Sequence, residues 1–409
     1  MLQTVDVGVQ SIDVFKDIIG EEALAELRHL ADQLKGARIV EINATPYGGG
    51  VSELLRSTVP LMLDLGLDVR WQVIYGDDQF FGITKAMHNA LQGAEAPLSS
   101  RAREIYLTYN SRNAMLLDRN FDYVVVHDPQ PAPIRELHGR DNAKWVWRCH
   151  IDTSHPNPEV WAFLRPFVEQ YDAAVFTMQE FVPRNLRGPR INIMQPAIDP
   201  LSPKNLPLPL ELAWRILDWI GVDIDRPLIT QVARFDPWKD PLGVIEAFRV
   251  ARQQHPELQL ALVGSMALDD PEGWGIYRRM QEASAGDPSI RIYTNLTGVG
   301  NVEVNAFQRF SSVVVQKSLR EGFGLAVSES LWKGTPVVAG RVGGIPYQMP
   351  DGVGGFLVDT VEETAERILY LLDNPREAAD IGARGQERVT KMFLITRLIR
   401  DELALLASL

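Results

Sequence analysis

The sequence feature that most limits the fold is a series of short apolar runs separated by longer amphipathic segments. Short runs between helical segments are typical of parallel strands buried on both faces of a sheet. Each half of the chain contains six runs, enough for one open twisted sheet, so we predict an α/β protein with two such domains. The predicted strands are 38–43, 69–75, 122–126, 144–149, 173–176 and 191–194 in the first half, and 228–233, 258–263, 290–293, 313–316, 336–339 and 356–358 in the second.

The chain length also favours two domains, because single hydrophobic cores stop growing at roughly 250–300 residues and the chain has 409. The best linker is segment 200–209, whose four prolines disfavour both helix and central strand. We therefore expect an N-terminal domain at 1–200, beginning with a helical lead at 20–35, and a C-terminal domain at 210–385. Segment 386–409 is expected to form a helix that packs back on the N-terminal domain.

Charge argues against a nucleic-acid partner, because 41 Lys and Arg face 53 Asp and Glu, a net charge of −12, whereas such proteins need clustered cations. A small phosphorylated ligand is not excluded. The single cysteine, Cys149, cannot form an intrachain disulfide. Residues 1–20 lack a basic segment followed by an apolar run, and no apolar stretch of about 18 residues occurs. We expect a cytoplasmic protein without a membrane span.

The turns after the strands are the informative positions, because open α/β sheets bind ligands beyond the carboxyl ends of their strands. The first such turn ends in Gly48-Gly49-Gly50 before a predicted helix. Glycines at a helix N-terminus let backbone N–H groups approach an anion, which the helix dipole also favours. The turn matches neither the dinucleotide nor the P-loop pattern, so a tight turn without a ligand is the alternative.

The first such turn in the second half contains two cations, Arg234 and Lys239, around Pro237. Arginine offers a planar fork of donors and lysine a point charge, and both suit a phosphate. We expect the two side chains to converge on one anion. A pair of solvated surface charges is the alternative.

The segment 321–329, Glu-Gly-Phe-Gly-Leu-Ala-Val-Ser-Glu, follows another apolar strand. Gly322 and Gly324 permit close backbone approach at a helix N-terminus, and Glu321 and Glu329 would lie about 12 Å apart in a regular helix. That span is comparable with a diphosphate and its attachments, so one carboxylate could bind a sugar and the other a ribose. Two glutamates that only decorate a helix are the alternative.

These three features, in this order over two Rossmann-like halves, resemble the retaining glycosyltransferases of family 4. The resemblance covers the chain from about residue 36. It implies the GT-B fold, in which two doubly wound parallel-sheet domains face a central cleft. Segments 126–130, 147–152 and 233–241, together with Phe80-Phe81, Lys85 and His88-Asn89, resemble the branch of trehalose glycosyltransferring synthases and trehalose phosphorylases.

The resemblance implies that Arg234 and Lys239 hold the donor diphosphate and that Glu329 binds the ribose hydroxyls. Glu321, with the amides after it, would bind hydroxyls of the transferred glucose, and His150 would contact that glucose near its 6-hydroxyl. The implied donor-binding residues are Gly49, Gly50, His150, Arg234, Lys239, Gly322, Phe323, Gly324, Leu325 and Glu329.

On the acceptor side, the resemblance implies that Asp128 and the turn 48–50 face the acceptor glucose. Lys85 and His88 are further candidates for that pocket. The implied acceptor-binding residues are Gly48, Gly49, Lys85, His88 and Asp128. The implied catalytic residues are Asp128, Arg234, Lys239 and Glu321, and no metal-binding residues are expected.

The implied reaction moves glucose from a nucleoside diphosphate glucose (UDP-, ADP- or GDP-glucose) to free glucose and forms α,α-trehalose with retention, reversibly. Retention could arise through a covalent sugar intermediate or by attack on the face that the phosphate leaves, and the resemblance implies the second. A trehalose phosphorylase is the main alternative, although its Glu329 would have no ribose to bind. Another family 4 sugar transferase, a nucleotide-sugar epimerase and a non-catalytic sugar-binding protein are further alternatives.

The expected partners are the nucleoside diphosphate glucose and glucose, or trehalose in the reverse direction. We expect no required cofactor, with a divalent cation such as Mg²⁺ allowed as a counterion of the diphosphate. The resemblance implies a homodimer, and no nucleic-acid or membrane partner is expected.

Overall fold

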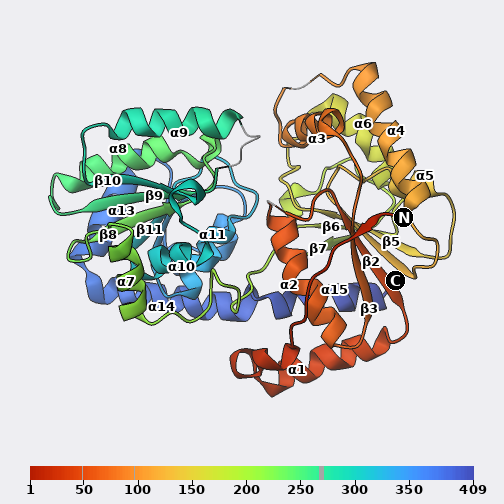
Figure 1. Ribbon diagram of the computed structural model, residues 1–409, viewed down its shortest axis with the longest axis horizontal. Helices are drawn as coiled ribbons and strands as arrows, with labels where there is room; N and C mark the ends of the chain where they lie inside the picture. The colour runs from red at the N-terminus through yellow and green to blue at the C-terminus, as the bar shows by residue number, and fades with distance from the viewer. Residues whose placement is uncertain (48, 96, 267–270) are drawn as a thin grey trace. The chain divides into compact units, whose positions relative to one another are not determined.

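The computed structural model describes residues 1–47, 49–95, 97–266 and 271–409. They form two compact units, here called the first and the second unit. The first unit comprises Met1–Ala197 and Ile395–Leu409, and the second comprises Ile198–Leu394. Each unit contains one sheet with helices on both faces, which confirms the predicted fold class (Figure 1).

The first unit is built on a seven-stranded sheet. In sheet order its strands are β1 (Gln3–Thr4), β3 (Asp68–Val73), β2 (Arg38–Asn43), β4 (Tyr123–His127), β5 (Lys144–Cys149), β6 (Ala173–Phe176) and β7 (Arg190–Ile193). All neighbours pair in parallel except β1, which is antiparallel to β3. After β3 the chain crosses to the other side of β2, so the carboxyl ends of β2 and β4 form the switch point at which such sheets bind ligands.

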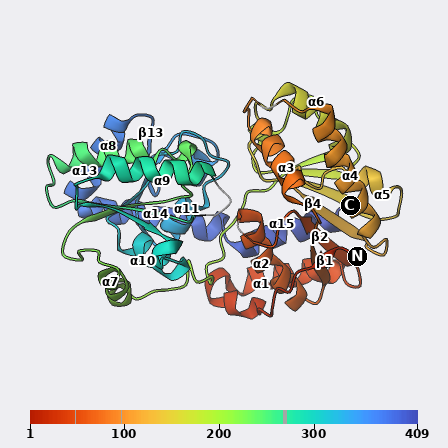
Figure 2. The same ribbon diagram turned by 45° about the horizontal axis from the view of Figure 1, so that its top comes forward.

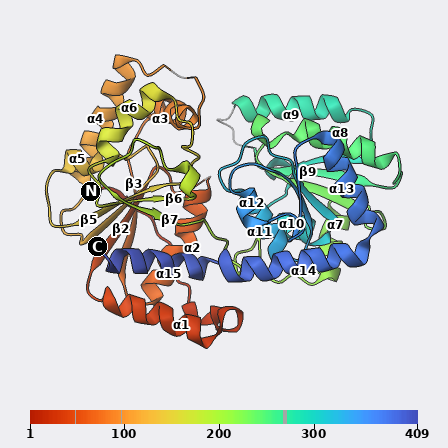
Figure 3. The same cartoon turned by 180° about the vertical axis from the view of Figure 1, so that it is seen from behind.

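Helices cover both faces of this sheet. They are α1 (Lys16–Gln33), α2 (Gly50–Asp64), α3 (Asp78–Leu91), α4 (Ser100–Leu116), α5 (Ile134–His138), α6 (Pro158–Val168) and α15 (Ile395–Ala407), with 3₁₀ helices η1 (Ile12–Phe15) and η2 (Gln179–Phe181). Helices α3 to α6 pack on one face, where Val40 and Trp147 join their core cluster (Figure 2). Glu41, His127 and Arg148 occupy the alternate strand positions and lie toward the opposite face. There α15 packs against α1 and α2 (Figure 3).

The second unit is built on a six-stranded parallel sheet. In sheet order its strands are β10 (Ile290–Thr294), β9 (Gln259–Gly264), β8 (Leu228–Val232), β11 (Val313–Gln316), β12 (Val337–Gly340) and β13 (Gly355–Val358). Strands β9 and β10 are added on one side of β8, and β11 to β13 on the other. The switch point therefore lies between β8 and β11.

Eight α-helices of the second unit fall within the described residues: α7 (Leu210–Trp219), α8 (Pro241–Arg252), α9 (Pro271–Ser284), α10 (Asn301–Phe310), α11 (Leu325–Trp332), α12 (Ile345–Gln348), α13 (Val361–Asp373) and α14 (Pro375–Met392). The 3₁₀ helices η3 (Pro237–Lys239) and η4 (Asn295–Thr297) follow β8 and β10. Leu260 and Leu262 pack with α8, α9 and α13, whereas Ala261 and Val263 pack with α7 and α10. This alternation follows from the two-residue period of a strand.

Each apolar run predicted to be a strand overlaps a strand of the structure, and four of them (38–43, 144–149, 173–176 and 313–316) have the same bounds. The two-residue β1 was not predicted. The proline-containing segment 200–209, expected to be a linker, lies in the second unit, where Asn205 is buried. Helix α14 also lies in that unit, whereas α15 belongs to the first. Among the described residues, none of the helices combines the length and apolar character needed to cross a bilayer.

Candidate active site

Asp128 and His150 come together at the carboxyl ends of β4 and β5, two neighbouring parallel strands. The His150 backbone N–H donates to Asp128 Oδ1 at 2.8 Å, and the Trp147 indole N–H donates to the Asp128 carbonyl at 2.9 Å. Asp128 has a φ of +64°, a left-handed conformation that a residue other than glycine adopts at a cost. The predicted acceptor residue Asp128 and the predicted donor residue His150 are thus neighbours joined by a direct hydrogen bond.

The Asp128 side chain is half-buried, and desolvation of its carboxyl raises the pKa of this group to about 7. The His150 N–H and the Arg148 guanidinium act in the opposite direction, because both favour the carboxylate. Near neutral pH the group exchanges between the acid and the carboxylate. It can therefore donate a hydrogen bond to a sugar hydroxyl or accept one.

A buried polar chain leads from His150 into the first unit. His150 Nε2 lies 2.8 Å from His127 Nδ1, and His127 Nε2 lies 2.6 Å from Glu41 Oε2. Behind Glu41, Glu402 of α15 accepts from Arg148 Nη1 at 3.1 Å. Apart from His150, these residues were not predicted as part of a site. The sequence did contain a sign of this chain of residues: Glu41 and Arg148 stand within apolar strand segments. Charged side chains are rarely buried without partners, so such positions indicate a buried polar contact.

The remaining acceptor candidates lie on two helices. Gly49 caps α2 and Gly50 begins it, and a Cβ at either position would meet no atom within 4 Å. Steric crowding therefore does not explain the two glycines. Their backbone is exposed at the start of α2, where its N–H groups are accessible to a ligand. Lys85 and His88 lie one turn apart on α3, with Lys85 exposed and His88 half-buried. Gly48 lies outside the described residues.

In the second unit, Lys239 and Glu321 form an ion pair after the neighbouring strands β8 and β11. Only 18% of the Lys239 side chain and 11% of the Glu321 side chain are exposed. Gln231 donates to the Lys239 carbonyl at 2.7 Å and so fixes the end of η3, while Ser318 donates to Glu321 at 3.3 Å. The structure therefore brings one predicted diphosphate-binding cation against the predicted sugar-binding carboxylate.

Arg234 behaves differently from Lys239. Its side chain is 74% exposed, and its Nη2 lies 3.8 Å from Asp236 Oδ2. The two cations pair with different carboxylates, Arg234 with Asp236 and Lys239 with Glu321. These ion pairs therefore do not bring the two cations to one point, and their convergence on one anion stays a prediction.

The glycines of segment 321–329 set the backbone before α11. Gly324 has a φ of +85° and caps the helix, which begins at Leu325. Glu321 therefore lies in the preceding loop, and the 12 Å spacing expected for a regular helix does not apply. Gly343 has a φ of +52°, and a Cβ there would lie 1.7 Å from the Glu321 carbonyl oxygen. The Gly344 N–H donates to the Gly322 carbonyl at 3.0 Å, which holds this loop in place.

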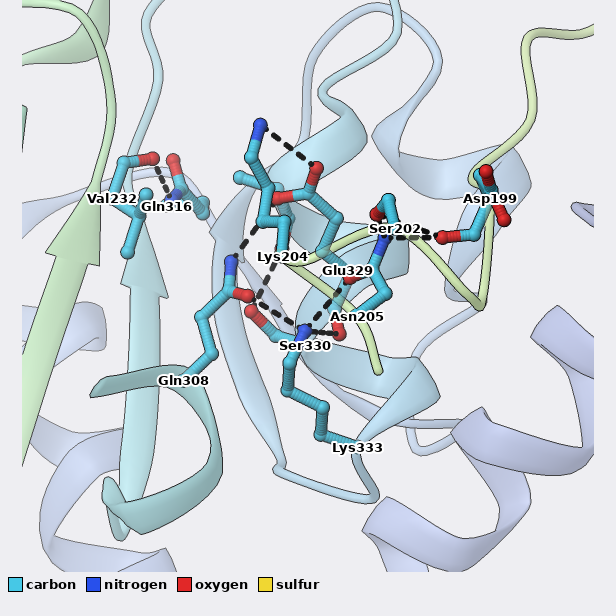
Figure 4. A network of polar contacts seen from close by, with 11 residues as sticks. Asp199, Ser202, Lys204, Asn205, Val232, Gln308, Gln316, Glu329, Ser330 and Lys333 are labelled. Atoms are coloured by element: carbon cyan, nitrogen blue, oxygen red, sulfur yellow. Dashed lines mark hydrogen bonds and ion pairs between the residues drawn. The ribbon is translucent and has the colours of Figure 1, made fainter. Parts of the chain in front are cut away.

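The buried Glu329 belongs to a polar network around α11 (Figure 4). Gln308 Nε2 donates to Glu329 Oε2 at 3.3 Å, and Lys204 Nζ lies 3.4 Å from Glu329 Oε1. Lys333 Nζ donates to Asn205 and Gln308 side-chain oxygens at 2.9 Å each, and to the Glu329 carbonyl at 3.0 Å. Burial lowers the pKa of Lys333 to about 7. Of this network, only Glu329 was predicted.

The predicted residues thus divide between the two units, with Asp128 after β4 at the switch point of the first sheet and the Lys239–Glu321 pair at that of the second. Phe323 is buried, and Gln348 donates to its carbonyl, so it anchors the loop rather than exposing its ring. Within the described residues, no group of three or more His, Cys, Asp or Glu side chains is arranged to hold a metal ion. Backbone amides, two cations and several carboxylates are therefore the groups available to an incoming ligand.

Two family models match the chain: "Trehalose synthase, N-terminal domain" at residues 41–183 and "Glycosyl transferases group 1" at residues 218–388. A trehalose synthase of Rubrobacter xylanophilus is 50% identical, over 100% of this chain and 99% of that protein. A trehalose phosphorylase of Pleurotus pulmonarius is 28% identical, over 87% of this chain and 55% of that protein. The α,α-trehalose 6-phosphate synthase structure from Burkholderia multivorans superposes with a TM-score of 0.71 at 15% identity, over 91% of this chain and 98% of that one, and thus shares the fold.

Proposed function

The chain belongs to the trehalose synthase family of glycosyltransferases with the GT-B fold, and we propose that it transfers glucose from a nucleoside diphosphate glucose to free glucose. The proposed product is α,α-trehalose. In this proposal the second unit binds the nucleotide sugar, and the first unit binds the acceptor glucose through Asp128.

The observation that carries the proposal is the Lys239–Glu321 pair at the switch point between β8 and β11, directly before the N-terminus of α11. A diphosphate suits this position, because its oxygens can accept hydrogen bonds from the Lys239 ammonium and from the backbone N–H groups at the start of α11. Glu321 can accept hydrogen bonds from glucose hydroxyls on the same side. Glu329, four residues into α11, would accept the ribose hydroxyls.

In the proposed step, the bond between the anomeric carbon and the diphosphate oxygen breaks, and the anomeric carbon bonds to the anomeric oxygen of the acceptor. The proton of that hydroxyl passes to the leaving diphosphate, and the configuration is retained. Charge grows on the diphosphate as the bond breaks, so nearby cations stabilise the transition state more than the ground state. One charge pair at 4 Å and an effective dielectric near 20 contributes about 4 kcal/mol before desolvation.

A trehalose phosphorylase is the second candidate, because such proteins are among the relatives. The nucleotide-dependent reaction is preferred in this proposal because it gives Glu329 a partner, the ribose, that phosphorolysis lacks. Gln308 and Lys204 contact the two carboxylate oxygens of Glu329 and fix its position. The expected cytoplasmic location, the homodimer and a Mg²⁺ counterion for the diphosphate stay predictions that rest on the sequence and the family resemblance.

The cosubstrate decides between the two candidates. The purified chain is incubated with glucose and UDP-, ADP- or GDP-glucose, and separately with trehalose and inorganic phosphate without nucleotide. We expect trehalose and free nucleoside diphosphate in the first set, and no glucose 1-phosphate in the second. Phosphorolysis of trehalose without nucleotide, with no trehalose formed from any of the three donors, would contradict the proposal.

A further inference from the structure

Glu41 and Glu402 form a carboxyl pair inside the first unit. Both side chains are buried, and each carboxyl lies within hydrogen-bonding reach of the other. Glu41 comes from β2 and Glu402 from α15, near opposite ends of the chain. Among the described residues, no nitrogen or hydroxyl donor reaches Glu41 Oε1.

Such a pair holds one proton. Two buried carboxylates facing each other repel strongly, and among the described residues the one guanidinium at the pair, that of Arg148, contacts Glu402 alone. Burial, followed by the charge of Glu41, raises the pKa of Glu402 well above its usual range, and burial also raises the pKa of Glu41. One shared proton leaves one negative charge, which Arg148 balances.

We place the shared proton between the two carboxyl groups, where it also serves Glu41 Oε1, which no protein donor reaches among the described residues. With the proton there, Glu41 Oε2 carries no hydrogen and accepts one from His127 Nε2. His127 is neutral, since burial lowers its pKa to about 3, and its Nδ1 then has only a lone pair. His150 Nε2 must therefore carry the hydrogen of the 2.8 Å contact between the two rings.

We propose that Glu41, Glu402 and His127 are positioning residues that fix His150 as its Nε2–H tautomer, so that its Nδ1 accepts a hydrogen bond from a hydroxyl of the bound sugar. The sugar contact rests on the proposed function, whereas the tautomer does not. The chemistry selects a hydroxyl donor at this position and disfavours a carbonyl or ether oxygen, which cannot donate a hydrogen bond. His150 also donates its backbone N–H to Asp128, so the chain orients both groups at once.

Nuclear magnetic resonance tests the tautomer without any substrate. The chain has seven histidines, so two-bond proton–nitrogen correlations of a nitrogen-15 histidine-labelled sample can be assigned with single substitutions. At pH 7 we expect neutral Nε2–H rings at both His127 and His150. A Nδ1–H ring or an imidazolium at His150 would overturn the proposal. This readout stays valid even if the chain forms no trehalose, so the two proposals can fail separately.

A matched pair of variants tests the role of Glu402. In Glu402→Gln an amide N–H replaces the shared proton, and the amide oxygen still accepts from Arg148; in Glu402→Leu both contacts are lost. We expect His150 to lose its single tautomer in the Leu variant, and the KM for the sugar that His150 contacts to rise about tenfold, the effect of one lost hydrogen bond. The Gln variant should keep both the tautomer and the KM of the unsubstituted chain. If Gln reverses the tautomer of His150, or if Leu leaves tautomer and KM unchanged, the proposal is wrong. If the Leu variant does not fold, the His150 tautomer in the Gln variant and in the unsubstituted chain still tests the proposal.

Titration with the sugar ligands tests the contact itself. On addition of glucose, or of UDP-, ADP- or GDP-glucose, the His150 Nδ1 resonance should shift in the direction of an accepted hydrogen bond. The nucleoside diphosphate, which carries no glucose, serves as the control. A Nδ1 resonance that stays unshifted at saturating concentrations of both glucose and nucleotide sugar would overturn the sugar contact while leaving the tautomer intact.

Discussion

Lys239 and Arg234 follow the same strand, yet their environments differ. Lys239 is largely buried against Glu321, whereas three-quarters of the Arg234 side chain is exposed, at 74%. Water screens the field of an exposed cation far more than that of a buried one. Under the proposed function, Lys239 should therefore stabilise the leaving diphosphate more than Arg234 does.

Single alanine substitutions measure this difference. Lys239→Ala should lower kcat at saturating donor by about 10²- to 10³-fold, the loss found when one preorganised donor to a developing oxyanion is removed. Arg234→Ala should lower it by roughly tenfold. Arg215→Ala is the matched control, because that exposed cation on α7 pairs only with Glu211 among its described ion pairs. Normal turnover in Lys239→Ala would contradict the role assigned to this residue.

Single residues also show where sequence reasoning stopped. Asp128, Lys239, Glu321 and Glu329 could be selected because they follow predicted strands or stand beside glycines. Glu41 could not be paired with Glu402, because the two meet only through tertiary folding and no local pattern links them. The Lys239–Glu321 contact was missed for the same reason, although both residues were predicted individually.

At the scale of elements, the strands were predictable and their surroundings were not. Runs such as 144–149 have strand bounds that follow directly from burial on both faces. Segment 200–209 was predicted to be a linker because its prolines exclude helix and central strand, but the prolines do not show which unit the segment packs on. Its Asn205 accepts from Lys333, so this segment helps to hold α11.

The Lys333 amine gives this part of the second unit a pH-dependent stability. Its pKa is about 7 in the folded chain, below the ordinary lysine value of 10.5, so unfolding takes up a proton between these two pH values. The free energy of unfolding should then rise with pH above about 7, by at most about 1.4 kcal/mol per pH unit. Lys333→Met removes this contribution.

Urea-induced unfolding of the full chain and of Lys333→Met at pH 7, 8 and 9 provides the measurement. The stability difference, unsubstituted chain minus variant, should increase from pH 7 to pH 9. A difference that is constant or falls with pH would show that Lys333 keeps its proton in the folded chain.

At the scale of the whole molecule, each unit supplies one part of the proposed chemistry. The net charge of −12 says little about the charge of the proposed ligand, since Lys239 and the start of α11 are local features of an acidic chain. The first unit is completed by α15 from the C-terminus, which brings Glu402 to Glu41. The fold class could be predicted from the two series of strands. A C-terminal helix packing on the first domain could also be predicted, but the residues that it contacts there could not.

The central claim is that glucose moves from a nucleotide sugar to free glucose. The most direct test supplies carbon-13-labelled glucose and unlabelled nucleoside diphosphate glucose under initial-rate conditions and reads the product by nuclear magnetic resonance. We predict trehalose with one labelled and one unlabelled ring, both in the α configuration. Release of unlabelled glucose without trehalose, or a product with a β linkage, would contradict the claim.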